Sequence, residues 1–148
     1  MIDLQNVLKE WDKDCQIDSM NLDESARLSP NLHSKYLQLY SVAKLQLKKV
    51  EHSQKVLLKK KYLYYNGKMS QEEIEREGWP YDPFDGLHII KTNLEYYYDS
   101  DLDIQTSEEK VEYWKTVIST LKDILENIKW RQQTIRNIID FRKFQSGG

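Results

Sequence analysis

The residues best suited to chemistry lie between Val50 and Gly67, in the run VEHSQKVLLKKKYLYYNG. The run holds four lysines against one glutamate, and three tyrosines follow close to its end. Ammonium groups neutralise the phosphates of a nucleic acid, and flat rings stack on bases that are not paired. The pattern predicts a surface for single-stranded nucleic acid. The alternative is a solvated basic face of a helix whose tyrosines pack in a core.

Catalytic and cofactor motifs are absent from the sequence. His33, His52 and His88 have none of the spacings that metal ligands show, and Cys15 has no histidine near it along the chain. There is no glycine-rich phosphate loop of the Walker type. We therefore expect a protein that is not an enzyme and that uses no cofactor and no metal ion.

The composition predicts an all-α fold in one domain. The chain has 148 residues, of which 31% are charged, with five glycines and three prolines. A β-sandwich or barrel needs more turn residues than this. The single cysteine fits a reducing compartment, and no segment has the character of a signal peptide or a membrane span.

The charges are segregated along the chain. Residues 28–68 carry nine lysines and one acidic residue, whereas residues 69–109 carry twelve acidic and two basic residues. Such blocks predict a basic surface for a polyanion and an acidic surface for a protein partner. For the acidic block, a solvated linker is the alternative.

Periodicity predicts a short helix over residues 2–15 and a long one over about 30–66. The long helix should begin with Ser29 as N-cap and Pro30 at its first position, and it should end at Asn66-Gly67. The following segment, 69–105, is expected to be irregular. Within it, a short helix over 71–77 is capped by Ser70, and residues 87–98 are ambiguous between helix and strand.

A second long helix is predicted over about 107–144, capped by Thr106 with Glu109 three residues on. Apolar residues recur along it at heptad spacing, which is typical of a helix that packs on a partner helix. They are Val111, Ile118, Leu125 and Ile139 on one stripe and Trp114, Leu121, Ile128 and Ile135 on the other. We expect these residues to hold a homo-oligomer, and a buried hairpin within one chain is the alternative. The single domain over 1–148 would then comprise a basic DNA-binding helix (30–68), an acidic segment (69–105) and an oligomerisation helix (106–145).

Several stretches resemble the UvsY family of phage recombination mediators. They are the segment from Ile17 to Glu24, the segment from His33 to Leu37, the run from Lys55 to Gly67, and the pair Tyr113-Trp114. The run from Lys55 is the most specific, because it is similar to the family's Lys-Val, Leu-Lys-x-Arg and Tyr-Tyr-x-Gly pattern. The sequence departs from that pattern at Lys61, where the family has arginine, and at Lys60, where it has a small residue.

The resemblance implies a non-enzymatic mediator in phage recombination, repair and recombination-dependent replication, acting in the host cytoplasm. Members bind single-stranded DNA, contact a RecA-like recombinase and a single-stranded-DNA-binding protein, and help the recombinase replace that protein. They form hexameric or heptameric rings. The rival interpretations are a coiled-coil scaffold without nucleic-acid binding and an architectural protein for double-stranded DNA.

Carried onto this chain, the resemblance makes Lys59 and Lys61 the main DNA contacts, with Lys60 added. The basic run itself contributes Lys55, and the rings of Tyr64 and Tyr65.

Overall fold

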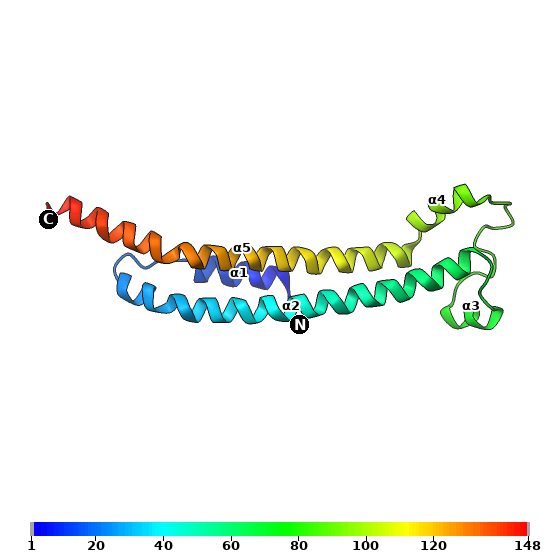
Figure 1. Cartoon of the computed structure of the whole chain (residues 1–148), viewed down its shortest axis with the longest axis horizontal. Helices are drawn as coiled ribbons and strands as arrows, with labels where there is room; N and C mark the ends of the chain where they lie inside the picture. The colour runs from blue at the N-terminus through cyan, green and yellow to red at the C-terminus, as the bar shows by residue number, and fades with distance from the viewer. Residues whose placement is uncertain (1, 148) are drawn as a thin grey trace. The chain divides into compact units, whose positions relative to one another are not determined.

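The computed structural model describes residues 2–147, and these form five α-helices and one 3-10 helix without any strand (Figure 1). The prediction of an all-α fold is confirmed. The helices are α1 (Leu4–Asp14), α2 (Leu22–Tyr65), α3 (Gln71–Glu77), η1 (Lys91–Asn93), α4 (Leu94–Asp99) and α5 (Leu102–Gln145). None of the helices in this range has an apolar stretch long enough for a bilayer crossing.

The chain divides into two compact units. The first comprises residues 1–46 and 114–148, and the second comprises residues 47–113. The two long helices, α2 and α5, each contribute residues to both units. The segments predicted from the sequence (30–68, 69–105 and 106–145) rest on charge and periodicity. Their boundaries therefore differ from those of the two units.

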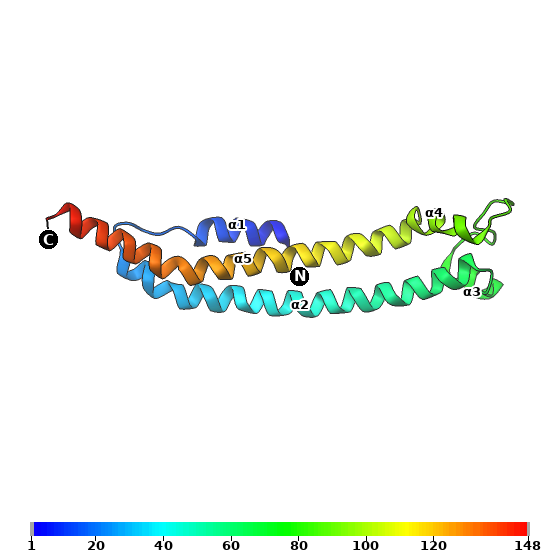
Figure 2. The same cartoon turned by 45° about the horizontal axis from the view of Figure 1, so that its top comes forward.

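The first unit is a bundle in which α1 lies beside the early part of α2 and the later part of α5 (Figures 1 and 2). Asp3 caps α1 by accepting a hydrogen bond from the Gln5 amide at 3.0 Å. The Trp11 ring meets the buried Tyr36 ring edge-on, with 5.5 Å between their centroids. The core consists of Val7, Tyr36, Ala43, Trp114, Val117, Leu121, Ile124, Ile128 and Ile135.

Two polar groups fix the C-terminal end of α1 in this bundle. The Asp14 carboxylate accepts hydrogen bonds from the Lys35 ammonium at 2.7 Å and from the Tyr36 hydroxyl at 2.8 Å. The buried Arg131 guanidinium donates to the carbonyl oxygens of Cys15 at 3.1 Å and Gln16 at 3.0 Å. A cation at the end of a helix satisfies carbonyls that have no partner within the helix.

The predicted start of α2 at Ser29-Pro30 is wrong, because the helix begins at Leu22 and contains Pro30. A proline inside a helix removes the hydrogen bond to the carbonyl four residues earlier, here that of Ala26. The side-chain amide of Gln132 donates to this carbonyl at 3.2 Å. A residue of α5 thus supplies the hydrogen bond that Pro30 cannot make.

The predicted start of α5 at Thr106 is also wrong. The helix begins at Leu102, where the Asp101 carboxylate accepts a hydrogen bond from the Ile104 amide at 3.0 Å. Thr106 lies inside the first turns and donates to the Leu102 carbonyl at 2.8 Å. Asp is as good an N-cap as Thr, and it is favoured further by the positive end of the helix dipole.

The other predicted boundaries of α2 and α3 are confirmed. Gly67 has a φ of 68°, and the Lys68 amide donates to the Leu63 carbonyl at 2.8 Å, as in a Schellman turn. Ser70 caps α3 through the Glu73 amide at 3.2 Å. Within the ambiguous range 87–98, the structure has η1 and α4 and no strand.

Replacing Gln132 by Ala should lower the free energy of unfolding by about 0.5–1.5 kcal/mol, because the Ala26 carbonyl loses its hydrogen bond. In a Pro30→Ala background the restored backbone amide takes that role, so the same substitution should cost almost nothing. Urea unfolding of the four proteins measures this coupling. Equal costs in both backgrounds would mean that Gln132 does not compensate for the proline.

Candidate nucleic-acid interface

The basic run lies on the last part of α2, inside the second unit (residues 47–113). A helix advances about 100° per residue, so residues spaced three and four apart share a face. One face points inward, because its residues are buried or half-buried: Val50, Gln54, Leu57, Lys61 and Tyr64. The opposite face is exposed and carries Lys48, His52, Lys55, Lys59 and Tyr62, which we call the basic strip.

Lys61 lies at the centre of the inward face. Its side chain is 4% exposed, and its ammonium is 2.9 Å from the Asp101 carboxylate and 3.0 Å from the Asp103 carboxylate. The ammonium also lies over the indole ring of Trp79, 3.8 Å from the centroid. The two carboxylates and the ring replace the water that a surface ammonium would keep.

Tyr64 and Tyr65 are part of the same packed region. The Tyr64 hydroxyl donates to the Pro80 carbonyl at 2.6 Å, and its ring contacts Trp79 with 5.0 Å between centroids. The Tyr65 hydroxyl donates to Asp101 at 2.6 Å, and its ring is surrounded by other rings. These rings are Tyr64, Phe84, Tyr97 and Tyr98.

The protonation of this region follows from its burial and hydrogen bonds. Burial acts to raise the pKa of the Asp101 carboxyl, but hydrogen bonds from Tyr65 and Lys61 lower it, and the result lies below the ordinary value. Burial, together with the hydrogen bond to Asp101, raises the pKa of the Tyr65 hydroxyl. Asp101 therefore stays ionised and Tyr65 stays protonated at neutral pH, which keeps the network intact.

The expectation that Lys61, Tyr64 and Tyr65 lie open on a DNA-binding surface needs correction. All three side chains point inward, because the acidic residues at the start of α5 and the aromatic residues after α3 pack on that face of α2. Sequence reasoning missed Asp101 and Trp79 as partners of this run. The available signal was the helical period, which places Lys61 on the same side as Leu57 and Tyr64.

Lys55, Lys59 and Lys60 remain on the outside. The Lys60 ammonium pairs with Glu77 of α3 at 2.8 Å, and both side chains are partly exposed. In the part of the chain that the structure describes, Lys48, Lys55 and Lys59 are exposed and have no ion pair or hydrogen bond. These three ammonium groups are available to phosphates without breaking an internal contact.

The residues predicted for oligomerisation are placed differently along α5. Val111, Trp114, Leu121, Ile128 and Ile135 are buried, Ile118 and Leu125 are half-buried, and Ile139 is 38% exposed. The predicted stripe of Val111, Ile118 and Leu125 is therefore displaced after Val111. The buried residues lie one position earlier than Ile118 and Leu125, at Val117 and Ile124, and Arg131 continues this line. The buried residues therefore form part of the core of the single subunit. Their contribution to contacts between subunits stays a prediction.

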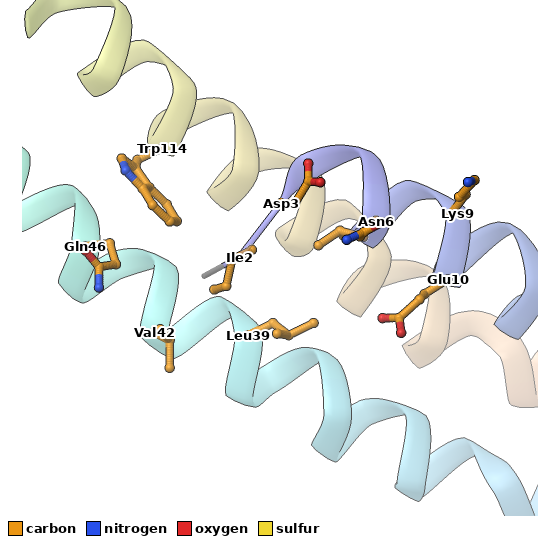
Figure 3. A pocket seen from close by; sticks show the side chains of 10 residues that line it. Ile2, Asp3, Asn6, Lys9, Glu10, Leu39, Val42, Gln46 and Trp114 are labelled. Carbon is orange, nitrogen blue, oxygen red and sulfur yellow. The ribbon is translucent and has the colours of Figure 1, made fainter.

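A groove that was not predicted lies in the first unit (residues 1–46 and 114–148). It has a volume of about 770 Å³, and Figure 3 shows Ile2, Leu39 and Val42 along it. Its two carboxylates have structural roles, because Asp3 caps α1 and Glu10 lies 3.6 Å from the Lys35 ammonium.

The comparisons with known proteins agree with the likeness noted in the sequence. A family model described as "Recombination, repair and ssDNA binding protein UvsY" matches residues 10–148. This chain belongs to the UvsY family. The recombination protein uvsY of Enterobacteria phage T4 is 27% identical over 144 residues, which cover 97% of this chain and 98% of that protein.

Solved structures of a family member have the same fold. In one crystal form (lattice type II), the bacteriophage T4 recombination mediator protein UvsY matches this chain with a TM-score of 0.81 at 27% identity, covering 99% of both chains. In another form (lattice type IV) the TM-score is 0.78 at 26% identity, covering 97% of this chain and 99% of that one. The match thus includes both long helices rather than a shared motif alone.

The Lys61→Met variant should lose about 3–5 kcal/mol of unfolding free energy at pH 7, because it leaves the Asp101 carboxylate buried without its counter-charge. The lowered native pKa of Asp101 means that this carboxylate stabilises the fold above pH about 4, and its contribution fades as the pH falls through that pKa. Removal of the ammonium raises this pKa. The deficit of the variant should therefore shrink as the pH is lowered.

Urea unfolding at pH 7 and pH 4 measures the deficit, and Lys60→Met is the matched control. The Lys60 pair is partly exposed, so its removal should cost at most about 1 kcal/mol. A deficit for Lys61→Met that is as small as that of the control would contradict the role given to the buried pair.

Proposed function

We propose that this chain is a recombination mediator, which binds single-stranded DNA and promotes loading of a RecA-like recombinase onto DNA covered by single-stranded-DNA-binding protein. The observation that carries the proposal is the basic strip, in a chain whose family is described as recombination, repair and ssDNA binding. The bacteriophage T4 relative, which has the same fold, is a recombination mediator protein. No catalytic role is part of this proposal.

The strip contacts the strand through phosphates. Lys48, Lys55 and Lys59 follow one another along the helix at about 10 Å and 6 Å, given a rise of 1.5 Å per residue. These ammonium groups lie on one line and match a polyanion that runs along α2. Lys60 adds a further cation at the edge of the strip when it leaves Glu77. Ammonium groups respond to phosphate charge, so binding depends little on base sequence.

A few lysines in one subunit bind weakly, so we propose that the active form is a homo-oligomer, of six or seven subunits as the family resemblance implies. Linked strips raise the effective concentration of sites for one strand. The aromatic residues near the end of α5 support a contact between subunits. They are Trp130, Phe141 and Phe144, which are 58%, 60% and 80% exposed.

The recombinase and the single-stranded-DNA-binding protein are proposed to contact the acidic segment. Acidic side chains crowd residues 69–109, and apolar side chains are exposed among them. The exposed apolar residues are Tyr81, Leu87, Ile90, Tyr96 and Leu102. A surface that combines acidic groups with apolar and aromatic side chains suits a basic partner protein.

Substitution of Lys48, Lys55 and Lys59 by Ala should reduce affinity for single-stranded DNA by at least tenfold. The log–log dependence on salt should become shallower by about 0.7 for each phosphate that the variant no longer neutralises. Fluorescence anisotropy of a labelled oligonucleotide over a salt series measures both. The matched control replaces three exposed lysines of α5, Lys110, Lys115 and Lys122, and removes the same charge.

The mediator role is tested on DNA covered beforehand by single-stranded-DNA-binding protein. Addition of the native chain should shorten the lag before the recombinase hydrolyses ATP, and the strip variant should not. A chain that binds no single-stranded DNA at low salt would instead be a scaffold. Equal weakening in the strip and control variants would mean that binding reflects net charge and not the strip.

Substitution of Phe141 and Phe144 by Ser should reduce the native mass of the protein and weaken DNA binding, because the strips of different subunits are no longer linked. These side chains are exposed in the subunit, so its helical content should persist. Light scattering and circular dichroism measure the two properties. A native protein with the mass of a monomer would overturn the proposed oligomer.

A further inference from the structure

We propose that Tyr62 is the residue on which a base of the bound strand stacks. This inference rests on the proposed function, because it concerns the same basic strip. It assigns the aromatic contact to a side chain that differs from the two tyrosines expected from the sequence. The assignment depends on exposure, on the neighbours of the ring and on its place in the strip.

The three tyrosines at the end of α2 have different surroundings. Tyr64 is 5% exposed and Tyr65 is half-buried, and both hydroxyl groups donate hydrogen bonds inside the second unit. Tyr62 is 51% exposed. Among the residues that the structure describes, its ring stacks on no other ring and its hydroxyl makes no hydrogen bond. Of the three rings, that of Tyr62 is open to a base.

Cations lie on both sides of this ring along the chain. Lys55 and Lys59 precede Tyr62 by seven and three residues on the same helix face, at about 10 Å and 5 Å along the axis. On the other side, the Lys68 ammonium lies 5.9 Å from the ring centroid. Phosphates held by these groups place an intervening base over the ring. The distance of Lys68 is close to the limit for a cation–π contact, so a base displaces it easily.

The backbone under the ring is fixed. The Tyr62 carbonyl accepts two hydrogen bonds from Asn66, one from the backbone amide at 3.1 Å and one from the side-chain amide at 2.7 Å. The turn at Gly67 then closes the helix with the bond from Lys68 to Leu63. The ring is thus carried by a rigid helix end and loses little freedom when a base covers it.

Stacking contributes roughly 1–3 kcal/mol per base, which corresponds to about fivefold to 150-fold in affinity. The Tyr62→Leu variant should therefore bind oligo-dT about tenfold more weakly than the native chain. Its affinity for an abasic strand of equal length should change by less than twofold, because the phosphate contacts remain. Tyr62→Phe should bind both strands as the native chain does.

Anisotropy titrations of both strands are compared with those of Tyr113→Leu, a control at a tyrosine of α5 that is 37% exposed and lies outside the strip. Equal weakening on oligo-dT and on the abasic strand would overturn the proposal, and so would no change on either strand. Salt-dependent binding of the abasic strand keeps the proposed function intact in both cases. If the native chain bound neither strand, the proposed function itself would fail.

Discussion

The ion pair between Lys61 and Asp101 is the contact on which the second unit depends. It joins the last turns of α2 to the start of α5, and Tyr65 donates a hydrogen bond to the same carboxylate. Asp101 also caps α5 through the Ile104 amide. One carboxylate thus sets the start of a helix, the rotamer of a tyrosine and the position of an ammonium group. The outward direction of the basic strip follows, because the inward face of α2 is occupied.

The first unit (residues 1–46 and 114–148) uses a buried cation differently. Arg131 is 6% exposed, and its guanidinium donates to the backbone carbonyls at the end of α1. Its Nε atom has no hydrogen-bond partner in the described residues. Backbone dipoles therefore stabilise this cation, whereas carboxylates stabilise Lys61. In both units a cation on a long helix holds a segment that is distant in the sequence.

The sequence predicted those features of the structure that depend on residues close together in the chain, such as helix ends, caps and apolar stripes. The end of α2 at Asn66-Gly67, the cap at Ser70 and the Trp114 stripe of α5 were all predicted from short patterns. The start of α2 was missed, because the amide that compensates for Pro30 is 106 residues away from the carbonyl of Ala26. Lys61 was predicted to contact DNA because its partner, Asp101, is also distant in the sequence. Asp101 belongs to a block of acidic residues whose composition is typical of an exposed surface. The period of α2 places Lys61 on the face of Leu57 and Tyr64, but it does not identify Asp101 as the partner.

The three consecutive lysines at the end of α2 have three different degrees of contact with solvent. Lys59 is exposed and unpaired among residues 2–147, Lys60 shares its ammonium with Glu77, and Lys61 is enclosed. An amine-reactive reagent meets them in that order, because acylation requires the free amine and an approach from solvent. The rate of acylation should therefore decrease from Lys59 to Lys60 to Lys61. In a labelling experiment Lys61 serves as an internal reference for the intact fold, and protection of Lys59 reports a ligand on the strip.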